Sequence, residues 1–347
     1  MHYVKIAVLA ALVAALSFLA PFNYACAGDS QTPLKRYKLA TIAPKGVGWA
    51  VHYENLVLPV VRELAGDDFD VKVFWGGAMG DDEEILNKMR KGFLQGAGLS
   101  GQGATQACPA MSVVELPFLF DNYDEVDYVK EKMTPVFEAL FRQNGFYLFA
   151  WCDQDFDIII SKGVSFTRLE DFKDVRFMTW YGPLEEKLLT NLGADLVPLD
   201  IPEIAPAAQT GKYEAAIGPA AFVLGAQMHN VVRNINPCKI RYSPSVDLLT
   251  NAAWDAVPQA TKESYFKRRE ALMKKFNAKV REDNERSLQA LYTYGMKKDE
   301  FSPSELRRIK AATRHIGTDL AGKLYSRALL DELLQHLEDY RAAHGEQ

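Results

Sequence analysis

The alternation of apolar and polar residues in the middle of the chain predicts an open α/β sheet. Between Leu169 and Ala220 the pattern reads as turn, strand, helix, strand, helix and strand. The first of these strands, from Val175 to Trp180, shows the period of two that is typical of an extended chain. Such a unit buries a small parallel sheet between helices. Because ligands of open α/β sheets bind beyond the carboxyl ends of strands, we expect a binding site next to Trp180.

The N-terminal part of the chain predicts a second unit of the same kind. The expected elements are strands at 37–42, 71–75 and 96–100 and helices at 49–64 and 81–94. Their order, βαβαβ, is half of a doubly wound sheet. Pro59 predicts a kink in the first helix, because proline removes a backbone donor and crowds the preceding turn.

Two apolar segments, 146–151 and 156–161, predict strands, and the polar residues between them indicate a crossing between domains. Further on, a strand is expected at 231–235, which the chain leaves through Pro237 and Pro244.

From Pro258 to about Tyr294 the chain has neither proline nor glycine. This predicts one helix of roughly 37 residues, about 55 Å long. Such a helix exceeds one small domain, so we expect it to brace two. Dimerisation through a coiled coil is the alternative, although no heptad pattern is sustained.

These elements predict an α/β protein of two lobes, with the long helix spanning both. We expect residues 28–152 and 245–347, including the C-terminal helices, in the first lobe and residues 153–244 in the second. The chain of 347 residues is long enough for two such domains.

Residues 1–27 have the pattern of a secretory signal peptide. Lys5 precedes an apolar run at 6–22, and Ala25 to Ala27 are the small residues that a signal peptidase requires. A retained membrane anchor is the alternative, and the run is of marginal length for one. Cleavage after Ala27 predicts a periplasmic protein.

Three cysteines follow this segment: Cys108, Cys152 and Cys238. An odd number in an oxidising compartment leaves at least one of them without an intramolecular partner. They are either buried small apolar residues or include a bridge between Cys108 and Cys152. No C-x-x-C pair indicates a metal site.

Composition and motifs exclude several classes of function. The net charge of −5, without a basic stripe, argues against binding to nucleic acid. Gly98, Gly101 and Gly103 lack the helix start and acidic residue of a dinucleotide site, so no cofactor is expected. The sequence contains neither an H-E-x-x-H motif nor a G-x-S-x-G motif. Glu185 and Glu186 are adjacent on a helix and face different directions, so an enzyme is not expected.

An ordered series of short motifs resembles a known family. The motifs are residues 39–44 (LATIAP), 76–81 (GGAMGD), 116–120 (LPFLF), 171–173 (DFK), 192–194 (LGA) and 208–211 (AQTG). They resemble the extracytoplasmic solute receptors of tripartite ATP-independent periplasmic (TRAP) transporters, which are similar to dicarboxylate-binding proteins. The resemblance covers nearly the whole chain after residue 27. It implies a two-lobed clamp, expected to be monomeric, that closes on a solute and delivers it to membrane permease subunits driven by an ion gradient. A receptor that serves a sensory protein is the alternative.

The sequence departs from this family at the positions that the resemblance implies for the ligand. Met178 stands where the family has an arginine that binds the ligand carboxylate, and Asp157 stands at a second arginine position. Ile201 replaces a phenylalanine, and residues 214–219 (EAAIGP) replace a D-G-x-x-N-P run. We therefore expect a ligand with apolar or aromatic surface rather than a small C4-dicarboxylate.

Strand ends and these family positions together supply the candidate ligand-binding residues. They are Trp49, Trp75, Phe156, Asp157, Arg176, Met178, Trp180, Tyr181, Ile201, Pro219 and Phe222.

Three of these candidates have alternatives. Trp180 is either in the site or in the core, and Asp157 either faces the site or forms a hinge salt bridge. Arg176 shares a strand face with Met178, about 6.6 Å away. It is either an anion anchor, which would make the protein an ordinary carboxylate receptor, or a solvated residue at a strand start.

Overall fold

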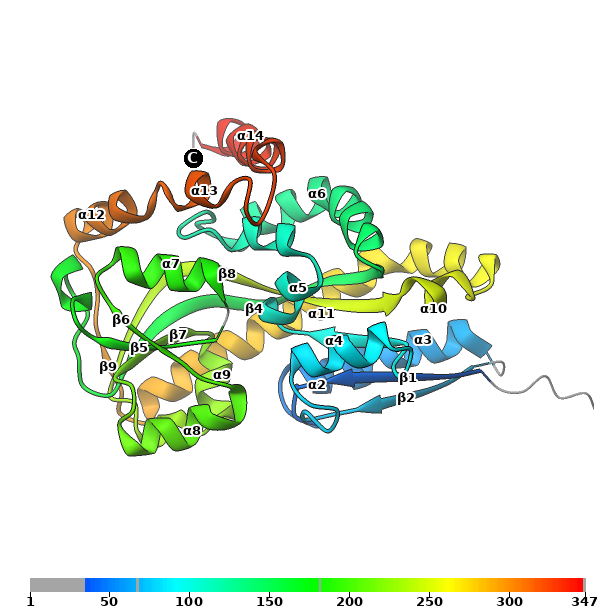
Figure 1. Ribbon diagram of the computed structural model, residues 1–347, viewed down its shortest axis with the longest axis horizontal. Coiled ribbons are helices and arrows are strands. Elements are labelled where there is room, and N and C mark those ends of the chain that lie inside the picture. The colour runs from blue at the N-terminus through cyan, green and yellow to red at the C-terminus, as the bar shows by residue number, and fades with distance from the viewer. Residues whose placement is uncertain (1–34, 67–68, 181, 346–347) are drawn as a thin grey trace, which may run out of the picture. The chain divides into compact units, whose positions relative to one another are not determined.

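The computed structural model describes residues 35–66, 69–180 and 182–345 (Figure 1). The expected signal peptide lies outside these residues. The described strands form one sheet in the order β2-β1-β3-β8-β4-β7-β5-β6, with β9 paired to β8.

The strands are β1 (Lys35–Thr41), β2 (Phe69–Phe74), β3 (Gly96–Leu99), β4 (Phe146–Ser161), β5 (Arg176–Thr179), β6 (Asp195–Pro198), β7 (Ala215–Gly218), β8 (Asn234–Thr250) and β9 (Lys297–Lys298). The longer helices are α3 (Leu58–Ala65), α4 (Asp82–Arg90), α6 (Tyr123–Gln143), α7 (Pro183–Asn191), α8 (Ile201–Thr210), α11 (Gln259–Thr293), α12 (Pro303–Thr313) and α14 (Arg327–His344). The short helices are α2 (Trp49–His52), η2 (Tyr53–Val57), α5 (Gly101–Ala107), η4 (Pro109–Glu115), η5 (Leu169–Phe172), α9 (Ala220–Gly225), η6 (Met228–Asn230), α10 (Asn251–Asp255) and α13 (Ile316–Leu320).

The N-terminal unit has the expected βαβαβ order, with β1 parallel to both β2 and β3. Asp81 begins α4 as its N-cap, because its side chain accepts a hydrogen bond from the Glu84 backbone N–H. The expected helix at 49–64 is divided: a π-helical turn, η2, separates α2 from α3 just before Pro59. The proline thus marks a local change of winding.

The central unit also agrees with the pattern of the sequence. Strand β5 pairs in parallel with β6 on one side and β7 on the other, and α7 and α8 connect them. Successive residues of β5 face opposite sides of the sheet, and both sides are covered: Phe177 and Met178 are fully buried in two different apolar cores.

The expectation of two short strands at 146–161 was wrong, because β4 is continuous over all 16 residues. It pairs with β8, a strand of 17 residues, along most of its length. Both strands continue from the β1–β3 part of the sheet into the β5–β7 part (Figure 1). The polar residues mark irregular pairing rather than a chain break.

Pro237 and Pro244 also lie within β8, although we expected the chain to leave the strand there. The pairing shifts between Asp153 and Asp155, opposite Pro244, and again between Asp157 and Ile159, beside Pro237. At such bulges the ladder lacks a hydrogen bond in any case, so the missing proline N–H costs little.

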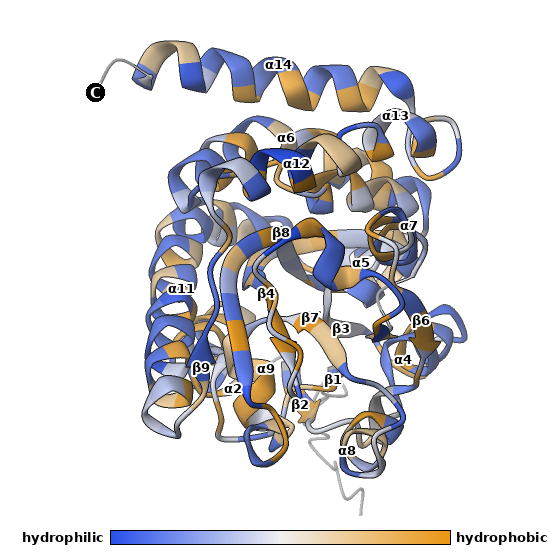
Figure 2. Ribbon diagram, turned by 90° about the vertical axis from the view of Figure 1, so that its left-hand side faces the viewer, coloured by the Kyte–Doolittle hydropathy of each residue, from blue (hydrophilic) through white to orange (hydrophobic). Residues whose placement is uncertain are grey.

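The long helix α11 has 35 residues and spans both parts of the sheet, as expected. It is mostly polar, whereas β4 and β7 are apolar (Figure 2). Its buried side chains, including Phe276, Val280 and Leu291, form a narrow apolar stripe. Cys108, Cys152 and Cys238 are free thiols.

The C-terminal segment contacts both parts of the molecule, although we expected it in the first lobe. Helix α12 packs on η5 and α7, whereas α14 packs on α6. Ion pairs between Arg308 and Glu170 and between Lys187 and Asp319 hold this segment to the central unit.

Asp153 binds several elements together where β4 passes from one part of the sheet to the other. Its carboxylate is fully buried and accepts hydrogen bonds from Lys130 Nζ and Arg281 Nε, each at 2.8 Å, and from Tyr242 OH at 2.6 Å. Burial opposes ionisation, but Lys130 and Arg281 outweigh it and lower the pKa of Asp153. The carboxylate therefore joins α6, α11, β4 and β8.

We expect Asp153→Asn to destabilise the protein by about 3 kcal/mol, because it leaves the buried Lys130 without its counter-charge and removes one of the two carboxylates that bind Arg281. The folded pKa of Asp153 is lowered, so its contribution is complete above the unfolded pKa of about 3.9 and is lost as pH falls further. Urea unfolding at pH 7 and pH 3.5 measures both effects.

The matched control is Asp127→Asn. Asp127 accepts a hydrogen bond from the same Arg281 at 2.8 Å, but its side chain is 51% exposed. A loss of less than about 1 kcal/mol is expected for this pair. Equal losses for the two variants would contradict the role assigned to Asp153.

Candidate functional site

A cavity of about 330 Å³ lies at the carboxyl ends of β1, β3, β5 and β7. The loop from Thr41 to Trp49 and residues 98–100 form one wall, and Trp180, Pro219 and Phe222 form the other. Gln154 and Ser245, from the long strands, and Val280, Asp283 and Asn284, from α11, complete the lining. The cavity therefore lies between the two β-α-β units, where the sequence predicted a site.

Gly98 positions the aromatic residue of the first wall. A Cβ atom on Gly98 would lie 2.7 Å from Trp49 Cη2, so only glycine lets this indole lie against β3. Trp49 also stacks on Tyr53, with ring centroids 4.8 Å apart, and meets the edge of Phe276. The indole is thus held by packing on several sides.

The opposite wall carries a second aromatic pair. Trp180 and Phe222 are stacked, with ring centroids 5.5 Å apart and planes inclined by 17°. Trp180 follows β5, and its backbone N–H donates to the buried carboxylate of Glu185 at 2.9 Å. Aromatic surfaces therefore contribute to both walls of the cavity, which suits a flat apolar ligand.

Two buried polar atoms in the lining have no hydrogen-bond partner among residues 35–66, 69–180 and 182–345. They are the donor Trp49 Nε1 and the acceptor Asn284 Oδ1. Buried polar groups are normally paired, so an unpaired donor and acceptor at one cavity point to a ligand group. Together they match a neutral head that both accepts and donates hydrogen bonds.

In the part of the chain that the structure describes, Asp283 is the single ionisable residue of the lining. Burial opposes its ionisation, but hydrogen bonds from Arg286 and from His52 Nε2, the latter at 2.7 Å, outweigh it and lower its pKa. Asp283 is therefore an ion-paired carboxylate, and no described Lys or Arg lines the cavity.

Four of the residues proposed from the sequence line this cavity: Trp49, Trp180, Pro219 and Phe222. Trp75, Phe156 and Met178 lie elsewhere among the described residues. Trp75 meets the edge of Tyr53 and lines a separate polar groove. Phe156 packs between Tyr123 and Tyr242, and Met178 is fully buried in the core beneath β5.

Asp157 forms a buried ion pair rather than facing the cavity. Its Oδ2 accepts hydrogen bonds from Arg241, which also binds Glu115 at 3.1 Å, and all three side chains are buried. Burial raises the pKa of Asp157, and Arg241 partly offsets this effect. Burial raises the pKa of Glu115 to about 8. The salt bridge considered as the alternative for Asp157 is present.

Arg176 begins β5, at the strand end opposite Trp180. Its side chain is 46% exposed and pairs with Glu214 at 3.2 Å. This is the solvated position considered as the alternative to an anion anchor. Tyr181 lies outside the described residues, and Ile201 begins α8 with a side chain that is likewise not described.

Sequence patterns did not indicate the α11 residues Asp283 and Asn284 as part of the site. They lie one turn after Val280 on the same helix face, so helical spacing relates them. That spacing does not reveal which face meets a cavity, because α11 is polar on most sides. Gln154 was recognised only as part of a polar segment.

A sheet of two β-α-β units with a cavity between them at the strand ends is the architecture of a solute-binding protein. The family model of bacterial extracellular solute-binding protein, family 7 (DctP), matches residues 55–322. The chain belongs to this family. Its members are the solute receptors of TRAP transporters, they work with membrane permease subunits, and they are binding proteins rather than enzymes.

Relatives and solved structures agree with this assignment. A solute-binding protein of Verminephrobacter eiseniae is 22% identical over 68% of this chain and 71% of its own length. The C4-dicarboxylate-binding periplasmic protein DctP of Rhodobacter capsulatus is 22% identical over 74% and 76%. The sugar acid binding protein of Advenella mimigardefordensis, solved with galactonate, has a TM-score of 0.80 at 20% identity and covers 88% of this chain and 98% of its own.

The described helices include none that is long and apolar enough to cross a membrane. Among the same residues, no group of three or more His, Cys, Asp and Glu side chains is arranged to hold a metal ion.

We expect Gly98→Ala to displace the Trp49 indole and to destabilise the protein by about 1–3 kcal/mol, the usual cost of overpacking. Near-ultraviolet circular dichroism should report the changed tryptophan environment, and urea unfolding the stability.

Gly163→Ala is the matched control, because a Cβ atom there would meet no atom within 4 Å. It should change stability by no more than about 0.5 kcal/mol. If Gly98→Ala behaved like this control, Trp49 would not rest on β3 as described.

Proposed function

We propose that this receptor captures a small organic solute with a flat apolar or aromatic surface and a neutral hydrogen-bonding head. The observation that carries the proposal is a cavity with aromatic residues on both walls and no described cation in its lining. The receptor would act in the periplasm after removal of residues 1–27 and deliver the solute to the permease subunits of a TRAP transporter.

Apolar burial is strong enough to replace the missing arginine. A charge-assisted hydrogen bond contributes about 1.5–3 kcal/mol net. One aromatic ring that buries about 200 Å² contributes up to about 5 kcal/mol at 25 cal/mol per Å². A solute held between Trp49 and the Trp180–Phe222 pair therefore needs no ion pair for useful affinity.

The names of two relatives mention acids, a C4-dicarboxylate and galactonate. A carboxylate in this cavity would meet the ion-paired Asp283 and neutral donors such as Trp49 Nε1, without a described cation beside it. An uncompensated charge in a partly buried site is costly, so this geometry favours a neutral head.

We propose that the two β-α-β units are lobes that close on the solute. The boundaries expected from the sequence, 28–152 with 245–347 and 153–244, place the hinge in β4 and β8 beside Asp153. Contacts of α12 and α13 with α7 support assigning these two helices to the second lobe. A solute that touches both walls would favour the closed state.

The proposal is tested by thermal-shift screening of the purified protein, followed by calorimetry. Neutral aromatic and heteroaromatic amides, alcohols and lactams should raise the melting temperature, whereas succinate, malate and galactonate should not. Tight binding of these acids without any response to the aromatic compounds would refute the proposal.

Trp180→Ala should weaken the best solute from the screen at least about tenfold, because it removes stacking area from one wall. Arg176→Ala is the control and should leave the affinity unchanged, since Arg176 lies at the opposite end of β5. A loss of binding confined to Arg176→Ala would instead identify an ordinary carboxylate receptor anchored there. Calorimetric titration of the three proteins distinguishes these outcomes.

A further inference from the structure

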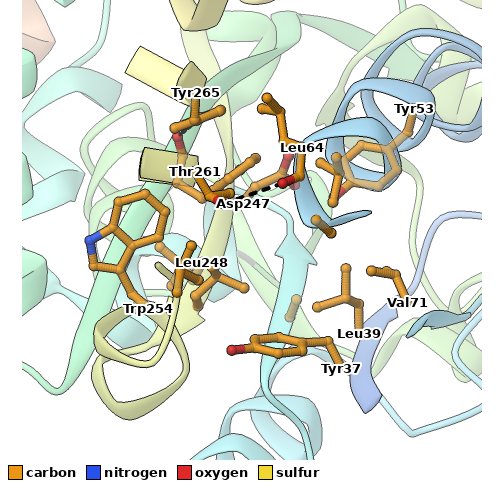
Figure 3. Close-up of a pocket in the computed structure, with 16 residues that line it drawn as sticks. Tyr37, Leu39, Tyr53, Leu64, Val71, Asp247, Leu248, Trp254, Thr261 and Tyr265 are labelled. Atoms are coloured by element: carbon orange, nitrogen blue, oxygen red, sulfur yellow. Dashed lines mark hydrogen bonds between the residues drawn. The ribbon is translucent and has the colours of Figure 1, made fainter. Parts of the chain in front are cut away.

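A second cavity, of about 90 Å³, lies within the first β-α-β unit and is separate from the solute cavity. It is lined by residues of β1, β2, β3, β4, β8, η2, α3, α10 and the start of α11. The side chains of Tyr37, Tyr53, Trp254 and Tyr265 surround it, with Asp247 between them (Figure 3).

The lining is apolar and aromatic apart from a few polar atoms, most of which are occupied. Tyr37 OH donates to Ala253 O at 2.9 Å, and Tyr265 OH donates to Phe149 O. At the rim, Thr261 Oγ1 donates to Leu64 O at 3.3 Å. These hydroxyl groups therefore stabilise the fold through hydrogen bonds to backbone carbonyl groups.

Asp247 is different. It is 3% exposed, and neither carboxyl oxygen has a hydrogen-bond partner among residues 35–66, 69–180 and 182–345. Burial raises the pKa of Asp247 well above its usual value. A buried carboxyl without a partner is unfavourable for stability, and such groups in native proteins usually have a binding or catalytic reason.

The titratable groups around Asp247 do not supply a counter-charge. Tyr53 and Tyr265 line the same cavity, and burial raises the pKa of both phenols further above neutrality. No Lys, Arg or His is among the described residues of the lining. An anionic ligand would therefore find no partner, and a cation would form an ion pair in an apolar interior, where desolvation offsets the attraction.

We propose that this cavity binds a small neutral molecule that has an apolar body and a head able to donate and accept hydrogen bonds, such as a short carboxamide. A protonated carboxyl and a carboxamide pair through two parallel hydrogen bonds, which satisfies both Asp247 oxygens. The cavity is smaller than the engineered apolar cavity of about 150 Å³ that holds benzene, so the body has only a few carbon atoms. This site is independent of the solute that the main cavity takes.

Propionamide is a suitable probe, because it has five non-hydrogen atoms and the required head. We expect a dissociation constant of about 1 mM, in keeping with so small a ligand. Saturation-transfer magnetic resonance on the whole purified protein should detect binding, and heteronuclear chemical-shift changes should map to α3, η2 and the start of α11.

Two variants test the assignment. Asp247→Leu should weaken propionamide at least about tenfold while the protein stays folded, because the change removes an unpaired polar group. Ala65→Leu should abolish binding by filling part of the cavity, which Ala65 lines. Asp255→Asn, which alters an exposed carboxylate paired with Arg142 beside the cavity, should leave binding unchanged.

Stability provides a readout that needs no ligand. Because the pKa of Asp247 is raised in the folded state, the folded protein keeps a proton on this carboxyl that the unfolded chain releases above about pH 4. The free energy of unfolding therefore decreases as pH rises. The gain in melting temperature from Asp247→Leu should therefore grow from pH 5 to pH 8.

Three results would overturn the proposal: no propionamide binding to the wild type, equal binding by wild type and Asp247→Leu, or shift changes confined to the Trp49 and Trp180 cavity. Failure of the solute screen would leave this site standing, because the two sets of shift changes involve different residues.

Discussion

A buried carboxylate, Asp153, holds the two halves of the sheet and two helices together at the point where β4 passes from one half to the other. A single carboxylate in an apolar interior would be strongly unfavourable. Here Lys130 and Arg281 approach it from two helices, and Tyr242 approaches from the neighbouring strand. The charges of Lys130 and Arg281 offset the cost of burying the carboxylate, and they also hold α6 and α11 against the strands. Because the cavity lies beside this crossing, these contacts also determine where its two walls meet.

A second group of buried charged side chains lies beside the second wall of the cavity. Arg241 and Asp157 are direct partners across β8 and β4, and Glu115 completes the group. By resemblance, Asp157 occupies a position where the family has a ligand-binding arginine. In this protein an arginine is still present, but on the neighbouring strand, where it binds the carboxyl groups of Asp157 and Glu115. Its charge stabilises the interior, so the cavity keeps aromatic surface and neutral polar atoms for recognition.

Periodicity predicted the βαβαβ unit and the β5–β7 unit because each of their elements has a short, clear pattern. It failed for β4 and β8, where bulges tolerate polar residues and prolines inside long strands. Trp75 and Trp180 both follow strands, so both were expected in the site. Of these two residues, Trp180 lines the cavity and Trp75 does not. The reason is the order of the strands: β2, which precedes Trp75, is at the edge of the sheet, whereas β5 lies between β7 and β6. Strand order depends on contacts between distant residues, and a local pattern does not contain it.

Gly98 lies close to both cavities: it lines the solute cavity, and its cross-strand partner Asp247 lines the second cavity. A Cβ atom at this position would lie 2.7 Å from Trp49 Cη2 and 3.1 Å from Asp247 Oδ1. Because Gly98 has no side chain, the indole of Trp49 and the carboxyl group of Asp247 on the paired strand both lie close to β3. Tyr53 lies next to both cavities, because it lines the second cavity and stacks on Trp49, which lines the solute cavity.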